Sequence, residues 1–150
     1  MKKYIGVKKI EAKPMTRGEY NKYRGWDLPQ NENPDDDGYL VKYSDNYESW
    51  SPKGIFDEAY RPCDHMSFGL AIEAIKRGHK VARKGWNGKN MFLFVANDID
   101  FSTKSDLSCC KHLKGNLTLP SIVMKTADER FCVGWLASQT DMLADDWEIV

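Results

Sequence analysis

The clearest periodic pattern of apolar and polar positions begins at Ser67 and ends at Gly78. Apolar side chains recur there with the spacing i, i+3, i+4 and i+7, at Phe68, Ala71, Ile72 and Ile75. This spacing predicts an amphipathic helix with one face on a core. Gly78, preceded by two basic residues, indicates where the helix ends.

Short apolar and β-branched runs follow this helix and predict an antiparallel sheet. The predicted strands are 80–84, 90–96, 119–126, 130–135 and 147–150. Asn87-Gly88 is a strong hairpin signal between the first two strands, so Trp86 is expected on a tight turn. Its indole either folds back onto the core or faces a ligand, and the pattern alone does not separate these alternatives.

Two further segments interrupt the predicted sheet. Ser138-Gln-Thr-Asp141 has the spacing of a capping box, which predicts a short helix to about residue 144. Residues 97–117 show no clear period, and we expect a long connection there. Connections of that length are uncommon unless they are functional or disordered.

The amino-terminal part predicts a strand, a helix, a hairpin and a second helix. Rough alternation predicts a strand over 2–12, and Thr16 with Glu19 forms a capping box for a helix over 16–24. Ser51-Pro52 predicts the N-cap and first position of a helix ending near Tyr60. The other predicted features are a loop over 27–38 and hairpin strands over 39–43 and 47–50. The expected core residues are Tyr4, Ile5, Ile10, Tyr20, Trp26, Leu40, Val41, Trp50 and Phe56.

These elements predict an α+β protein with two domains. Pro62 breaks the second helix, and a new helix start follows within a few residues. We therefore expect a small α/β module of unknown role over 1–62. Residues 63–150 are expected to form a short antiparallel sheet with a packed amino-terminal helix and a short capped helix near the carboxyl terminus.

Composition narrows the function classes. Lys and Arg (22) balance Asp and Glu (22), whereas a nucleic-acid-binding protein normally carries a basic excess. The sequence has no apolar run long enough for a membrane span, and its amino terminus is unlike a signal peptide. We therefore expect a cytoplasmic protein with neither nucleic acid nor membrane as a partner.

The sequence contains few signals for a metal or a catalytic site. Cys109, Cys110 and His112 with Cys63 and His65 could be assembled into a zinc site, but paired C-x-x-C elements are absent, and free thiols are the simpler interpretation. The acidic block near residue 36 lacks the register of an EF-hand loop. Since no nucleophile motif or phosphate-binding loop is present either, an enzymatic site is not predicted.

The capped helix start near Ser138 is better suited to binding a small anion. Free N–H groups and a positive dipole end would favour a phosphate there, and Trp135 would offer a stacking surface for a base. Lys125 and Arg83 are candidates for charged contacts to a diphosphate. Asp141 would repel a phosphate unless it caps the helix or takes ribose hydroxyls, and an ordinary capped turn remains the alternative.

Five sequence blocks, in order, resemble the phage family called Thoeris anti-defence two. They are Phe68-Gly-x-Ala-Ile-Glu-Ala-Ile-Lys-x-Gly78, Val81-Ala-Arg-Lys-Gly-Trp-Asn-Gly88, Met91-Phe-Leu, Met124-Lys-Thr-Ala-Asp128 and Trp135-Leu-Ala-Ser-Gln-Thr-Asp-Met-Leu-Ala-x-Asp-Trp147. The resemblance covers about residues 66–150. It implies a non-enzymatic sponge without cofactor or metal, which sequesters a TIR-derived cyclic ADP-ribose isomer in the cytoplasm of the infected bacterial host. It also implies a homotetramer with pockets between protomers, and in some members a separate site for cyclic dinucleotides.

The resemblance also implies which residues contact the ligand. Carried onto this sequence, the implied ligand-binding residues are Trp86, Asn87, Thr126, Ala137, Ser138, Gln139, Thr140 and Asp141. The amino-terminal part lies outside the resemblance and is similar to a module found in phage and prophage proteins. The alternative function is a phage structural or protein-interaction module without nucleotide binding.

Overall fold

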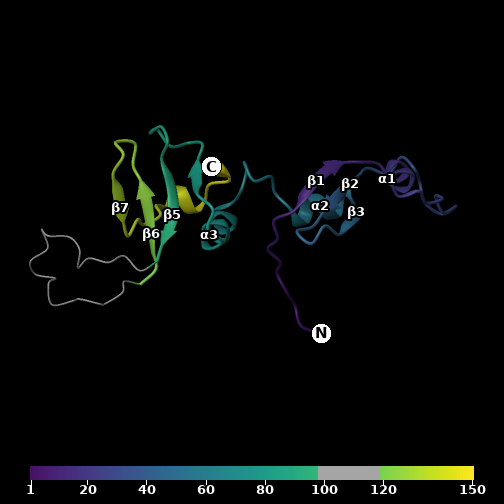
Figure 1. The fold of residues 1–150 in the computed structure, drawn as a ribbon, viewed down its shortest axis with the longest axis horizontal. Coiled ribbons are helices and arrows are strands. Elements are labelled where there is room, and N and C mark those ends of the chain that lie inside the picture. The colour runs from purple at the N-terminus through teal and green to yellow at the C-terminus, as the bar shows by residue number, and fades with distance from the viewer. Residues whose placement is uncertain (98–118) are drawn as a thin grey trace, which may run out of the picture. The chain divides into compact units, whose positions relative to one another are not determined.

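A computed structural model describes residues 1–97 and 119–150 (Figure 1). Its contacts divide the chain into two compact units, Met1–Arg61 and Pro62–Val150, here called the first and second unit. Within the described residues, helices accompany two sheets whose strand pairs are antiparallel. The predicted α+β class is therefore confirmed. The predicted connection over 97–117 lies almost wholly outside the described residues.

The first unit is a three-stranded sheet with the order β1-β2-β3 and two short helices. Its elements are β1 (Glu11–Pro14), α1 (Arg17–Arg24), β2 (Gly38–Lys42), β3 (Glu48–Pro52) and α2 (Lys53–Ala59). The hairpin and the loop over 27–38 are confirmed. Among the predicted core residues, Tyr20, Leu40 and Val41 are buried.

The strand predicted over 2–12 is wrong for most of its length. Pairing between β1 and β2 starts at Glu11 opposite Lys42, and β2 ends at that residue. The β1–β2 ladder therefore does not extend to the residues before Glu11, among which Tyr4 and Ile5 are 86% and 98% exposed. Their alternation reflects a solvated segment rather than one face of a sheet.

The starts of the two helices differ in how well the sequence predicted them. The capping box of α1 is confirmed, because Thr16 Oγ1 accepts from the Glu19 N–H while the Glu19 carboxylate accepts from the Thr16 N–H. The predicted N-cap Ser51 is wrong. Ser51 pairs with Tyr39 inside β3, so the strand continues to Pro52, which itself precedes α2.

The second unit packs one helix against a five-stranded antiparallel sheet with the order β7-β6-β5-β4-β8. Its elements are α3 (Phe68–Lys76), β4 (Val81–Arg83), β5 (Phe92–Ala96), β6 (Ser121–Lys125), β7 (Phe131–Val133), α4 (Gln139–Met142) and β8 (Trp147–Ile149). The predicted amphipathic helix is confirmed, and Gly78 follows it with φ +86°. The carboxyl-terminal strand adds to the sheet beside β4, as predicted.

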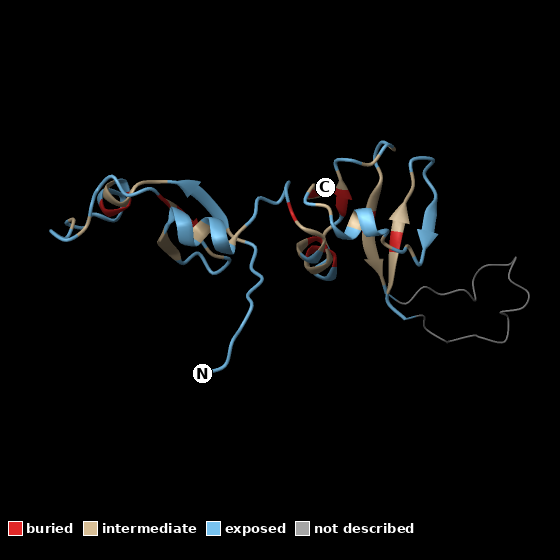
Figure 2. Ribbon diagram, turned by 180° about the vertical axis from the view of Figure 1, so that it is seen from behind, coloured by how far each residue is buried: buried red, intermediate tan, exposed pale blue. Residues whose placement is uncertain are grey.

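The core of the second unit lies between α3 and one face of the sheet. Ile75 from α3, Leu93 from β5 and Trp147 from β8 are each at most 2% exposed and belong to one cluster. Figure 2 shows the buried residues of this unit on α3 and on the sheet strands. Because side chains alternate along a strand, the residues between these core positions face the opposite side, which is called the open face below.

Candidate functional site

The predicted site residues come from three connections of the second unit. Trp86 and Asn87 lie between β4 and β5, and Thr126 lies at the turn after β6. Ala137 and Ser138 precede α4, and Gln139 to Asp141 form its first residues. Trp86 and Asp141 are in direct contact, since the indole Nε1 donates to Asp141 Oδ1 at 3.3 Å. The structure thus brings together two segments that are 55 residues apart in sequence.

The Trp86 ring packs on the core, which is one of the two alternatives that the sequence left open. Its centroid lies 5.5 Å from that of Trp147 and 6.2 Å from that of Trp135, both in edge-to-face geometry. The half-buried ring therefore packs on the core. The same side chain also lines a groove on the surface of the unit.

The Asp141 carboxylate accepts four hydrogen bonds from protein groups. Oδ1 accepts from Arg83 Nη1 at 2.9 Å and from the Trp86 indole. Oδ2 accepts from the N–H of Ser138 at 3.1 Å and from its hydroxyl at 2.6 Å. Two carboxylate oxygens offer about four acceptor positions. A ribose hydroxyl could therefore bind this carboxylate only by displacing a protein donor.

Arg83, considered above as a phosphate ligand, is instead bound to two carboxylates. Its Nε donates to Asp146 Oδ1 at 2.7 Å, in addition to the bond to Asp141. Only 17% of the Arg83 side chain and 13% of the Asp141 side chain are exposed. These three residues are called the carboxylate network below, and its guanidinium charge is already neutralised.

The carboxylate network lowers the pKa of Asp141. Burial of the carboxyl raises the pKa, but the hydrogen bonds from Ser138, Arg83 and Trp86 together lower it to about 2 from an ordinary value near 3.8. For Asp146, the hydrogen bond from Arg83 is the largest cause of a lowered pKa. Both carboxyls therefore favour the folded state in their charged form.

Acid is expected to destabilise the fold through Asp141. A folded pKa below the unfolded pKa contributes stability above about pH 4, of order 2 kcal/mol here, and that contribution is lost as the pH falls from about 4 to about 2. Thermal unfolding of the wild type and of Asp141→Asn from pH 7 to pH 2.5 measures it. The variant should start less stable and lose less on acidification.

The exposed Asp145 beside the network provides the matched control. Asp145→Asn removes a carboxylate of the same type without removing a partner of Arg83, so its stability should follow that of the wild type with pH. Parallel curves for the wild type and Asp141→Asn would show that Asp141 contributes no such stability.

The capping box at α4 uses part of the donors that were expected to be free. The Asp141 N–H donates to Ser138 Oγ at 3.2 Å, which together with the Asp141 carboxylate completes the predicted box. The hydroxyls of Ser138 and Thr140 are 2.8 Å apart. Ser138, Gln139 and Thr140 are exposed, and Ala137 is half-buried. The side chains of Ser138, Gln139 and Thr140 thus face solvent from a fixed backbone, whereas Asp141 does not.

Thr126 has a mainly local structural role in the described structure. Its hydroxyl accepts from the Arg130 N–H at 3.1 Å and lies 2.5 Å from Asp128 Oδ1. These contacts fix the turn between β6 and β7. Asn87 is exposed on the β4–β5 connection.

A groove of about 500 Å³ adjoins these connections. Cationic side chains and aromatic rings line it together: Lys80, Arg83, Lys84 and Lys125 with Trp86 and Phe92, alongside Ala82, Gly88, Asn90, Met91, Glu148 and Val150. The ammonium groups of Lys80 and Lys125 lie 4.7 Å and 5.8 Å from the centre of the Phe92 ring. This combination suits a flat ligand that carries negative charge.

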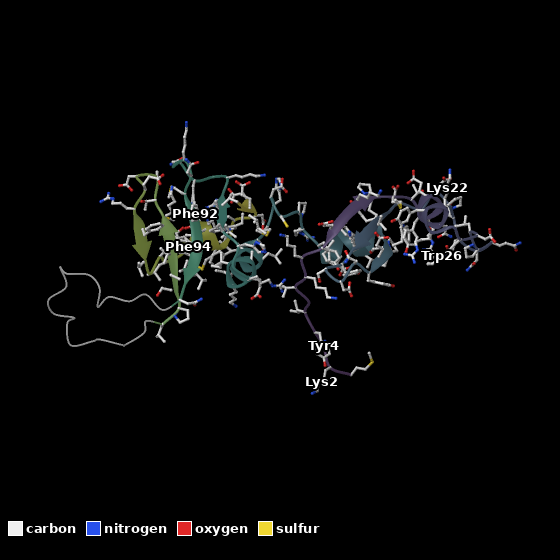
Figure 3. All side chains as sticks on the ribbon, viewed as in Figure 1. Lys2, Tyr4, Lys22, Trp26, Phe92 and Phe94 are labelled. Atoms are coloured by element: carbon white, nitrogen blue, oxygen red, sulfur yellow. The ribbon has the colours of Figure 1, made fainter. Side chains whose placement is uncertain are left out.

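Sequence reasoning missed most of the residues that line the groove. Phe92 and Phe94 alternate with the core residues Leu93 and Val95, so period-two reading of β5 could have placed both rings on the open face. Figure 3 labels the two phenylalanines on this strand. Lys80 carried no signal of its own, because an isolated lysine at a strand start is ordinary.

Neither a metal cluster nor a membrane helix is found in the described ranges. Residues 1–97 and 119–150 contain no group of three or more His, Cys, Asp or Glu side chains that could hold a metal ion. Cys109, Cys110 and His112 of the zinc alternative lie outside those ranges. No helix there has both the length and the apolar character that crossing a membrane requires.

The second unit is thus a small antiparallel α+β domain, backed by one helix, with a groove lined by cations and aromatic rings. Residues 66–150 match the Thoeris anti-defense 2-like domain. The same region is 42% identical over 85 residues to a Bacillus phage SP01 protein named Thoeris anti-defense 2, covering 57% of this chain and 94% of that protein. The chain therefore belongs to the Thoeris anti-defense 2-like family.

Proposed function

We propose that this protein binds a TIR-derived cyclic ADP-ribose isomer and sequesters it unchanged inside the infected bacterium, which blocks Thoeris immunity. The groove of about 500 Å³ beside Trp86 carries the proposal. Its volume falls within the range of small-molecule sites, roughly 300–1,000 Å³. The name of the family, Thoeris anti-defense 2, supports Thoeris as the defence system that the protein counters.

The groove residues fit the three chemical parts of such a nucleotide. Trp86 and Phe92 offer aromatic surface to the base, and Lys80 offers positive charge to the diphosphate, whereas Lys125 is already paired with Glu129 at 2.6 Å. Polar groups beyond the groove are available for ribose hydroxyls. We propose that the ligand contacts Trp86, Asn87, Thr126, Ala137, Ser138, Gln139 and Thr140, while Asp141 shapes the site through the carboxylate network.

The open face supports an oligomer. Phe131 and Val133 on β7 are 63% and 48% exposed, and Phe131 lies edge-to-face with Phe94 at 5.9 Å between ring centres. A contiguous apolar patch of this kind marks an interaction surface. We propose that a second copy covers it in a homotetramer. Because Phe92 borders both the patch and the groove, the ligand would then lie between protomers.

Binding without catalysis is tested by capture and release. The wild-type protein is mixed with the product of a TIR enzyme, the free nucleotide is measured after filtration, and the retained fraction is heated. Free nucleotide should fall in proportion to added protein, and heating should return it with an unchanged mass and chromatographic position. Recovery of a cleaved nucleotide would contradict sequestration and show that the protein is an enzyme.

The alternative is a phage structural or protein-interaction module. It is favoured by the first unit, which lies outside the family match and exposes Tyr23 and Trp26, each 53% exposed. Calorimetry against cyclic ADP-ribose isomers and cyclic dinucleotides separates the two functions. Absence of heat with every nucleotide would leave only the interaction module, and heat with a cyclic dinucleotide would widen the ligand class.

A further inference from the structure

Arg83 joins three segments that are separate in the sequence. From β4, its guanidinium reaches Asp146 before β8 and Asp141 in α4, and it also donates to the Thr140 carbonyl at 3.3 Å. Asp146 Oδ2 in turn accepts from the N–H of Gly85 at 2.9 Å. The start of the β4–β5 connection is thereby attached to the same carboxylates as α4.

The Trp86 side chain is fixed by this arrangement in addition to the bond that the Trp86 backbone N–H donates to the Arg83 carbonyl at 3.3 Å. Its indole N–H donates to Asp141 Oδ1, the oxygen that also accepts from Arg83 Nη1. Arg83 therefore orients the acceptor that holds the indole. The chain next to Trp86 is held by Gly85, where an added Cβ would come within 2.8 Å of Asp146 Oδ2.

An arginine is required at this position for geometric reasons. The guanidinium is planar and its Nε and Nη1 point in different directions, so it binds Asp146 and Asp141 at the same time. A lysine ammonium carries the same charge on a single nitrogen. Lysine would retain attraction to the carboxylates but could not hold both with the same geometry.

We infer that Arg83 is a positioning residue of the ligand site, which sets Trp86 and α4 for the nucleotide and, although it lines the groove, does not serve as a phosphate ligand. This inference rests on the proposed function. Its half-buried guanidinium is paired with two carboxylates and has no charge to spare for a diphosphate, whereas both groups that it orients, Trp86 and α4, belong to the proposed site. Loss of the two guanidinium bonds to Asp141 and Asp146 should therefore lower the affinity for the nucleotide more than it lowers the stability of the fold.

The test compares Arg83→Lys with Ile75→Val, which trims a buried core side chain outside the carboxylate network and lowers stability modestly. Both variants are measured by calorimetry with the TIR product and by thermal unfolding. Arg83→Lys should bind about 10- to 100-fold more weakly, while Ile75→Val should bind like the wild type even if its unfolding midpoint falls as far.

A ligand-free readout separates positioning from general destabilisation. The indole ¹H–¹⁵N signal of Trp86, assigned with Trp86→Phe, reports on the hydrogen bond to Asp141. It should move in Arg83→Lys and stay in place in Ile75→Val. An unmoved signal, or wild-type affinity in Arg83→Lys, would overturn the inference. If the wild type itself binds no nucleotide, the proposed function fails instead, and the indole signal still decides whether Arg83 positions Trp86.

Discussion

Replacing Trp86 with alanine is expected to weaken nucleotide binding by about 10- to 100-fold, because stacking of a base on an aromatic side chain contributes roughly 1–3 kcal/mol. The Trp86 ring lines the groove and is fixed by Trp135, Trp147 and the bond to Asp141. Alanine removes the stacking surface. Calorimetry with the TIR product, performed well below the unfolding temperature, measures the loss.

Two controls separate stacking from stability. Trp86→Phe retains an aromatic ring on the core but lacks the N–H donor to Asp141, so its affinity should lie between those of the wild type and Trp86→Ala. Trp26→Ala removes a half-exposed indole from the first unit and should leave the affinity unchanged. Wild-type affinity in a folded Trp86→Ala protein would place the ligand elsewhere.

Local signals predicted the scaffold of this site well. The stripe of α3 and the capping box at Ser138 depend on residues within one or two turns, and both are present in the structure. The strand predicted over 2–12 was wrong for most of its length because alternation of apolar and polar residues describes the two faces of a strand but does not provide a neighbouring strand to pair with. Only the register between β1 and β2 shows that pairing starts at Glu11.

The chemistry of the site depends on long-range partners that local signals do not contain. From the sequence, Arg83 is a candidate cation for a ligand. The two carboxylates that bind it, those of Asp141 and Asp146, lie 58 and 63 residues further along the chain. Asp141 reads as a repulsive charge at a helix start, but the same contacts neutralise it. Pairing of charges therefore decides which cations remain for a ligand. Lys125 is itself paired with Glu129 and Lys84 with Asp64, so the role moves from Arg83 chiefly to Lys80 of the groove.

Introducing a charge at Phe131 is expected to break the proposed homotetramer. Phe131 is 63% exposed on the open face and packs edge-to-face with Phe94. Phe131→Glu would place a carboxylate opposite Lys125 within the proposed interface, where removing a charge from water is unfavourable. Light scattering coupled to size exclusion should give the mass of a tetramer for the wild type and a smaller mass for the variant.

The same variant connects assembly to ligand capture. If the groove is completed by a neighbouring protomer, Phe131→Glu should lose nucleotide binding together with the tetramer, although Trp86 and the carboxylate network are untouched. Ile55→Glu, at a position 62% exposed in the first unit, adds the same charge outside the open face and should retain both mass and affinity. A dissociated Phe131→Glu protein that still binds nucleotide at wild-type strength would confine the pocket to one protomer, because no neighbouring residue would then be needed to hold the ligand.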